Sequence, residues 1–276
     1  MVSSPRGPSL QKNEGSSDAF LWEHLQTLPY FRAFLRAIEA SFYQDLDLPA
    51  PTLDLGCGDG HFAAHTFPRR LDVGLDPWAA PLREARARGA HRLLVQADGA
   101  AMPFASAAFA SAVSNSVLEH IPQVEAVLHE TARVLRPGAP FVFTVPNHRF
   151  PRLLWGARTL RRLGLPRLAA AYGRLFNRIS RHAHTDPPAV WEERLARAGF
   201  RVEQQWDYFP PRALAILEWG HPLGLPSLLV KALTGRWLLA PRRWNIAWLH
   251  RRLQRYAHQP RHPQGAYTFF LARRLG

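Results

Sequence analysis

Three glycines recur at every second position directly after a short apolar segment, in the stretch Leu-Asp-Leu-Gly-Cys-Gly-Asp-Gly at residues 53–60. Because they lack side chains, Gly56, Gly58 and Gly60 permit a tight turn from a strand into a helix and a close approach of a ligand to the backbone. Dinucleotide loops follow the pattern G-x-G-x-x-G, but His61 stands where their third glycine would be. The pattern therefore predicts a ligand-binding turn, with a dinucleotide-dependent dehydrogenase as an alternative.

Acidic residues stand at or near the ends of successive predicted strands. Asp54 belongs to the glycine turn, Asp76 follows it by 22 residues, and Asp98 comes after the next strand. A carboxylate in the position of Asp76 can accept hydrogen bonds from both ribose hydroxyls, and Asp98 can accept one from an adenine amino group. An anionic ligand would need arginines or a free helix N-terminus here. Three acids therefore favour a cationic nucleoside without phosphate, although each acid could also serve only as a helix cap.

These residues require a scaffold of strands that alternate with helices. Apolar and β-branched runs predict the strands, and amphipathic spacing with Gly and Pro stops predicts the helices. Strands are expected at 51–55, 71–76, 92–96, 109–114 and 139–145. Helices are expected at 60–67, 81–88 and 124–135. Such alternation with short links is typical of an α/β fold with a parallel sheet covered on both faces.

Five segments in register resemble one enzyme family, the class I S-adenosylmethionine-dependent methyltransferases, specifically their type 11 group. The segments are LDLGCGDG (53–60), GLDP (74–77), QADGAAMPF (96–104), SNSVLEHIP (114–122) and ARVLRPGAPFVFTVPN (132–147). The resemblance implies a Rossmann-like, doubly wound, mostly parallel sheet of seven strands. Segments 200–209 and 267–271 would form its closing antiparallel hairpin, with 210–264 as a helical insertion before the last strand.

The resemblance also implies S-adenosyl-L-methionine as the cofactor and a role for each matched residue. Asp54 would orient the turn and the amino group of the methionine moiety, and the three glycines would line the methionine and the ribose. Asp76 would bind the ribose hydroxyls, and Asp98 the adenine amino group. Two residues after the fourth strand would lie near the sulfonium. The predicted cofactor-binding set is Asp54, Gly56, Gly58, Gly60, Asp76, Pro77, Asp98, Gly99, Asn115 and Ser116.

Histidines are the candidates for a catalytic base. Methyl transfer is an in-line displacement that depends mainly on positioning, but a hydroxyl acceptor must also lose a proton. His120 is the first candidate because it follows the fourth strand, and His148 and His184 are further candidates, with His182 beside the latter. The alternative, which the sequence supports equally well, is that His120 has a structural role and no catalytic one.

No metal centre is expected in this sequence. Some quinone O-methyltransferases of the family carry a metal-binding glutamate where this chain has Ser116. The sole cysteine, Cys57, excludes an internal disulfide and a cysteine-based zinc site, and it fits a small packing residue.

Charge divides the chain of 276 residues into two halves. Residues 1–150 have a net charge of −2, whereas residues 151–276 have a net charge of +16 and seven of the nine tryptophans. The insertion places Trp219, Trp237, Trp244 and Trp248 near Arg236, Arg242, Arg243, Arg251 and Arg252. Aromatic and basic residues of this kind favour an anionic membrane surface or a lipid-like substrate, and segment 156–168 fits the same interpretation. A lid over an apolar pocket and a contact with RNA are the alternatives.

The predicted organisation has four parts. Residues 1–18 form a disordered tail, 19–48 the N-terminal helices with a break near Pro29, 49–149 the cofactor-binding core, and 150–276 the acceptor side. No signal peptide or membrane-spanning run is apparent, which favours the cytoplasm, with membrane association at its inner face.

The expected function is methylation, preferably on oxygen, of a hydrophobic small-molecule or lipid-like acceptor. An RNA-directed methyltransferase and a non-catalytic nucleoside-binding protein on the same fold are the alternatives.

Overall fold

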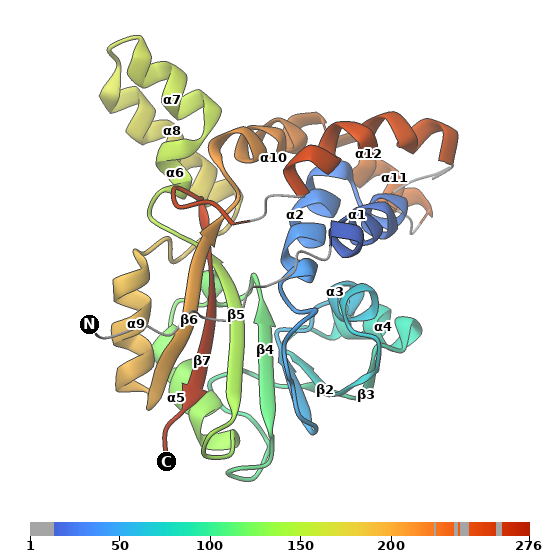
Figure 1. The fold of residues 1–276 in the computed structure, drawn as a ribbon, viewed down its shortest axis with the longest axis vertical. Coiled ribbons are helices and arrows are strands. Elements are labelled where there is room, and N and C mark those ends of the chain that lie inside the picture. Colours follow the sequence, from blue (N-terminus) through green and yellow to red (C-terminus); the bar gives the residue numbers. More distant parts are fainter. Residues whose placement is uncertain (1–13, 224, 235–236, 238–242, 258–260) are drawn as a thin grey trace, which may run out of the picture.

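The fold is organised around one seven-stranded sheet in the order β3-β2-β1-β4-β5-β7-β6 (Figure 1). Strands β1 to β5 pair in parallel, and β7 runs antiparallel to both β5 and β6. The computed structural model describes residues 14–223, 225–234, 237, 243–257 and 261–276. The strands are β1 (Thr52–Leu55), β2 (Leu71–Asp76), β3 (His91–Gln96), β4 (Ser111–Asn115), β5 (Pro140–Pro146), β6 (Phe200–Tyr208) and β7 (Tyr267–Arg274). The predicted α/β sheet with a closing antiparallel hairpin is thus confirmed.

Side chains on the two faces of the sheet enter separate hydrophobic layers. In β5, Phe141 and Phe143 pack with Trp191 on one face, whereas Val142 belongs to the layer on the other face. This follows from the two-residue period of a strand and explains why the central strands read as continuous apolar runs. The helices of this core are α3 (His61–Thr66), α4 (Ala79–Arg88), the 3-10 helix η1 (Leu118–His120), α5 (Val124–Val134) and α9 (Pro188–Arg197).

Two helices precede the sheet, α1 (Glu14–Thr27) and α2 (Tyr30–Ser41), and the chain breaks between them at Pro29 as predicted. Helix α1 begins earlier than predicted, since it includes residues 14–18 of the predicted disordered tail. Polar residues are common in the first turn of a helix, so the Ser- and Gly-rich composition did not mark its true start. The rest of the predicted tail, residues 1–13, lies outside the described residues.

Residues 150–276, the predicted acceptor side, are mainly helical apart from the closing hairpin in the part that the structure describes. Besides α9, their helices are α6 (Phe150–Leu153), α7 (Trp155–Arg162), α8 (Pro166–Ile179), α10 (Pro211–Leu223), α11 (Leu225–Thr234) and α12 (Arg243–Ala257). In Figure 1 these helices lie with α1 and α2 beyond the carboxyl ends of β4 and β5, and α7 and α8 project outward as a pair. Among the described residues, no helix is both long and apolar enough to cross a membrane.

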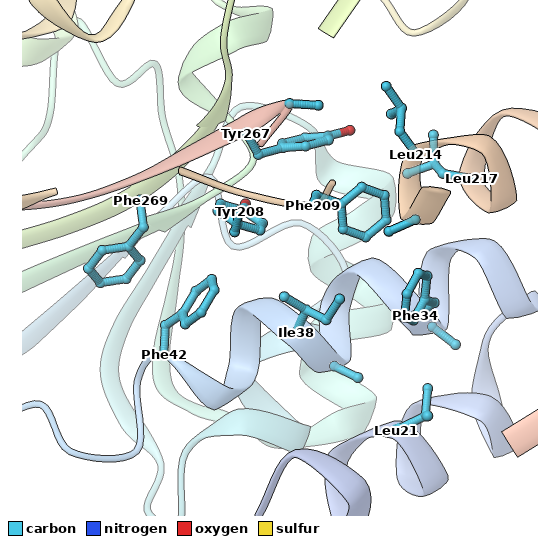
Figure 2. Close-up of a cluster of buried hydrophobic side chains, with 14 of the residues drawn as sticks. Leu21, Phe34, Ile38, Phe42, Tyr208, Phe209, Leu214, Leu217, Tyr267 and Phe269 are labelled. Carbon is cyan, nitrogen blue, oxygen red and sulfur yellow. The ribbon is translucent and has the colours of Figure 1, made fainter. Parts of the chain in front are cut away.

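Helix α2 is fixed to the closing hairpin by aromatic and aliphatic side chains. Figure 2 shows Phe34, Ile38 and Phe42 directed toward the ends of β6 and β7. Their partners there are Tyr208, Phe209, Tyr267 and Phe269, with Leu214 and Leu217 from α10. Each large apolar side chain buried in this way contributes about 1.5–3 kcal/mol. This packing holds the polar side chains of α2 over one end of the sheet.

Candidate functional site

The glycine turn has the backbone conformation that its sequence predicts. Gly56, Gly58 and Gly60 have φ angles of 74°, 55° and 70°, in the region that other residues rarely adopt. A Cβ atom at Gly56 would lie 2.3 Å from Val117 Cγ1, whereas one at Gly58 would meet no atom within 4 Å. Gly56 is therefore required by packing, and Gly58 faces open space.

That open space is a cavity of about 320 Å³, which we call the cofactor cavity. Its size lies within the range of small-molecule sites. It is bounded by the carboxyl ends of β1 and β4 and by helices α2, α3, α4 and α11. Its lining includes Arg32, Arg36, Asp54, Gly56, Cys57, Gly58, Asp59, Phe62, Asn115, Ser116 and Lys231.

The three predicted acids occupy different environments. Asp76 is buried and accepts hydrogen bonds from the backbone N–H groups of Gly58 and Trp78, at 3.0 and 2.9 Å. Burial raises the pKa of Asp76. Asp54 lines the cofactor cavity and lies 2.8 Å from His91 Nε2, while Asp98 is exposed beyond β3. Asp54 thus reaches the cavity, Asp76 borders it through Gly58, and Asp98 is not among its lining residues.

Asn115 and Ser116 line the cofactor cavity at the end of β4. Pro77 and Gly99 are not among its lining residues. Pro77 is exposed, and Gly99 lies against the hydrophobic layer, where an added Cβ would be 3.2 Å from Leu55 Cδ1. For Gly99 the structure therefore gives a packing reason instead of a ligand contact.

The site fits a nucleoside joined to an amino acid. Carboxylates at the turn offer acceptors for hydroxyl and amino groups, and the glycine backbone at position 58 leaves space for a ligand. These are the features expected of residues that hold S-adenosylmethionine.

Glu39 on α2 organises this end of the sheet, and no local sequence pattern points to it. Its fully buried carboxylate accepts hydrogen bonds from Arg36, Asn115, Ser116 and Tyr208, at 2.6, 2.7, 2.9 and 2.8 Å. Three of these donors, Arg36, Asn115 and Ser116, line the cofactor cavity. The separation of Glu39 and Tyr208 by 169 positions explains why no local pattern revealed the cluster.

A second, polar cavity of about 180 Å³ adjoins the first, and we call it the junction cavity. It shares Arg32, Arg36 and Ser116 with the cofactor cavity, and its lining also includes Glu119, His120, His182, His221 and Tyr267. The predicted base His120 therefore lies next to the predicted sulfonium end of the cofactor site.

The two histidines of the junction cavity are neutral near pH 7. Burial lowers the pKa of His120, and it lowers the pKa of His182 to about 3. The Nδ1 atom of His120 lies 3.0 Å from the carbonyl oxygen of Arg181, which can only accept a hydrogen bond. Its Nε2 therefore carries the lone pair in the neutral ring, 3.8 Å from Glu119 Oε1.

Glu119, next to His120 in η1, is a buried acid. Burial raises the pKa of its carboxyl group to about 8. Its Oε2 atom has no hydrogen-bond partner within the described part of the chain. The backbone oxygen of Glu119 accepts hydrogen bonds from Ala183 and His184 at 2.7 and 3.0 Å, which fixes the loop between α8 and α9 against η1.

The other predicted bases lie elsewhere. His184 contacts the carbonyl oxygen of Ile121 at 3.0 Å and Asp186 at 3.4 Å, and it lines none of the cavities described here. Its bonds hold the loop, so this position does not support a catalytic role, and His182 takes the place beside His120. His148, in the loop after β5, also lines none of these cavities, and burial lowers its pKa.

A third cavity, of about 760 Å³, is almost entirely apolar, and we call it the apolar cavity. It shares Phe31, Arg32 and His221 with the junction cavity. Most of its wall comes from α2, α7, α8 and α10: Phe31, Trp155, Tyr172, Leu175, Phe176, Ile179, Trp219 and Pro222, with Trp237 beyond α11. Cofactor, junction and apolar cavities thus form a series, and Arg32 lines all three.

Metal-binding geometry is absent from the residues that the structure describes, where no group of three or more His, Cys, Asp or Glu side chains could hold an ion.

Sequence comparison matches residues 53–143 to a family model described as a methyltransferase domain of the type 11 group. A trans-aconitate 2-methyltransferase of Methylobacterium radiotolerans is 29% identical over 201 residues, which cover 67% of this chain and 72% of the relative. A malonyl-[acyl-carrier protein] O-methyltransferase of Legionella pneumophila is 36% identical over 102 residues, 35% of this chain and 36% of that protein.

Solved structures share the fold at low sequence identity. One titled as a putative sarcosine dimethylglycine methyltransferase from Galdieria sulphuraria has a TM-score of 0.53 and 15% identity, and covers 87% of this chain and 83% of its own. The [4+2]-cyclase SpnF has a TM-score of 0.52 and 19% identity, covering 88% and 82%.

Proposed function

Because this chain is a class I S-adenosylmethionine-dependent methyltransferase of the type 11 group, we propose that it methylates an oxygen atom of a hydrophobic small-molecule or lipid-like acceptor. The observation that carries the proposal is the series of three cavities. The apolar cavity offers about 760 Å³ for the body of an acceptor, and the junction cavity separates it from the cofactor cavity. An acceptor with an apolar body and one polar end fits this arrangement.

Bound S-adenosylmethionine supplies a methyl group already activated on a sulfonium. The protein therefore contributes mainly positioning: the apolar cavity holds the acceptor so that its oxygen lies in the junction cavity. There, Nε2 of neutral His120 takes the proton of a hydroxyl acceptor. Arg32 lines the same cavity, and no carboxylate in the described residues lies within 4.0 Å of its guanidinium. Because no ion pair neutralises its positive charge, Arg32 stabilises the oxyanion that results.

The names of the relatives support a small-molecule or carrier-linked acceptor, but they do not bear on its apolar body, and they do not fix the substrate. One relative is named as acting on trans-aconitate, and others as O-methyltransferases of malonyl-[acyl-carrier protein]. We further propose that the protein works at the cytoplasmic face of an anionic membrane, because the basic, tryptophan-rich half of the chain surrounds the apolar cavity. An RNA acceptor and a non-catalytic, nucleoside-binding role are the alternatives.

Methyl transfer to matched acceptors tests this function. We expect the protein to bind S-adenosylmethionine in calorimetry and to transfer its labelled methyl group to hydrophobic hydroxyl compounds, such as long-chain alkylphenols, in preference to short polar ones. His120→Gln should lower kcat by about 100-fold while leaving the affinity for S-adenosylmethionine unchanged, since general-base catalysis contributes about 10²–10⁴-fold.

His129→Gln, on the exposed side of α5, is the control and should keep full activity. Cofactor binding without transfer to any acceptor in the panel would favour the non-catalytic alternative. Transfer to RNA and not to apolar compounds would contradict the proposed acceptor class.

A further inference from the structure

Helices α7 and α8 form a projecting hairpin with leucines exposed at its tip. Every residue from 161 to 168 is exposed, and the large side chains among them include Leu163, Leu165 and Leu168, whose exposed fractions are 68%, 42% and 54%. Figure 1 shows the pair extending beyond the rest of the helices. Leucines gathered at one exposed tip constitute an apolar patch, and such patches mark interaction surfaces.

The hairpin and its flanks carry positive charge only. Residues 150–185 contain eight arginines and no aspartate or glutamate. None of these arginines forms an ion pair with an acidic side chain in the described part of the chain. Their charges are therefore uncompensated and available to an anionic surface.

The apolar cavity opens beside this hairpin. Leu175 and Ile179 of α8 line the cavity although more than half of each side chain is exposed. Trp155 of α7 and Trp219 of α10 also line it and are partly exposed, with ring centroids 5.2 Å apart. Apolar side chains thus border the surface that lies between the leucine tip and the wall of the apolar cavity. Tryptophans at an interface, as Trp155 and Trp219 would be here, are typical of membrane contacts.

We propose that the α7–α8 tip docks into an anionic lipid bilayer, with Leu163, Leu165 and Leu168 entering the acyl boundary. The arginines of the hairpin would meet the phosphate headgroups. RNA is less suited to this surface: the arginines of the tip would serve its phosphates, but the exposed large side chains are leucines, which offer no aromatic plane on which bases stack. This inference rests on the proposed function, since docking here places the apolar cavity beside the source of a lipid-like acceptor.

Vesicle flotation of the full chain tests the proposal. The wild-type protein should float with vesicles of phosphatidylcholine mixed with phosphatidylglycerol, and less with pure phosphatidylcholine, and high salt should weaken the association. The triple variant Leu163→Asp, Leu165→Asp, Leu168→Asp should reduce the bound fraction by at least about tenfold, because it removes the apolar contacts and adds negative charge.

A matched control on another surface is Leu229→Asp with Leu233→Asp on α11, where the exposed fractions are 68% and 85%. This variant should float like the wild type. Calorimetry with S-adenosylmethionine checks that both variants retain the fold of the cofactor site.

The possible results separate the docking surface from the enzymatic proposal. Wild-type protein that stays in the soluble fraction, or a tip variant that floats unchanged, overturns the docking surface even if methyl transfer to apolar acceptors is intact. Binding of single-stranded RNA that is lost in the tip variant, without vesicle binding, would assign the hairpin to nucleic acid instead. Vesicle binding that depends on the tip, without any methyl transfer, would contradict the proposed function alone.

Discussion

At the scale of single residues, the chemistry of this site depends on side chains whose protonation is set by burial. His120 and His182 are neutral, and Glu119 beside them resists ionisation. Arg36 and Glu39 on α2 also face this acid, and the attraction of Arg36 only partly offsets the cost of burying a carboxylate. The junction cavity therefore combines neutral acid and base groups with the positive charge of Arg32.

Glu119→Gln should show how this acid affects stability. Its pKa is about 8 in the folded protein and 4.5 for an ordinary glutamate, so only the unfolded state ionises readily between these values. Folding is then penalised increasingly as the pH rises from about 4.5 to about 8, and the penalty levels off above that. The variant should gain stability over the wild type across this range in urea unfolding, and a gain independent of pH would contradict the assignment.

At the scale of elements, α2 connects two strands of the sheet, because its buried Glu39 accepts hydrogen bonds from Asn115 at the end of β4, from Ser116 after it and from Tyr208 of β6. This explains how a helix before the core takes part in the site. The apolar face of α2 fixes its position on the hairpin, and the polar cluster then orients Asn115 and Ser116.

Glu39→Gln should destabilise the protein by on the order of 3 kcal/mol, because Arg36 loses a buried ionic partner. Affinity for S-adenosylmethionine should fall in the same variant, since three donors to Glu39 line the cofactor cavity. Denaturant unfolding and calorimetry measure the two effects. In a double-mutant cycle, Arg36→Met should recover part of the loss, and simple additivity would exclude coupling of the pair.

At the scale of the whole molecule, the charge asymmetry coincides with a structural division between the sheet and the helices around the apolar cavity. The half with net charge −2 contains the glycine turn and most of the parallel sheet, and the half with net charge +16 contains the α7–α8 hairpin and the helices around the apolar cavity. Sequence reasoning gave most weight to the tryptophans of the insertion as a membrane contact. Of these, Trp219, Trp244 and Trp248 are exposed, whereas Trp237 packs between Arg32 and Lys231. Arg236 and Arg242 lie outside the described residues, and the membrane contact stays a prediction.

The whole protein should lose stability in acid. Burial lowers the pKa of His24, His61 and His65, which pack together between α1 and α3, and likewise that of His182. Unfolded histidine takes up a proton near pH 6.5 but these folded ones do not, so stability is present above that pH and falls below it. Glu119 acts in the opposite direction over this range, but four such histidines outweigh one carboxyl group, so melting temperatures should drop between about pH 7 and pH 5. His24→Phe should reduce that drop, because it removes one of these buried titratable groups. The two ring nitrogens of His24 have no hydrogen-bond partner in the described residues, so the substitution breaks no hydrogen bond there.

The sequence by itself determined the sheet, the glycine turn and the cofactor class, because these depend on local periodicity, on backbone freedom at Gly56, Gly58 and Gly60, and on motifs within 53–143. It also indicated His120, which lines the junction cavity, and the role of His120 as a base stays a prediction. Only the tertiary structure decided that Glu39 unites the site, that His182 and not His184 lies beside His120, and that three cavities follow one another. Those relations join side chains far apart in the chain, and burial and packing, which no local pattern records, determine which of them meet.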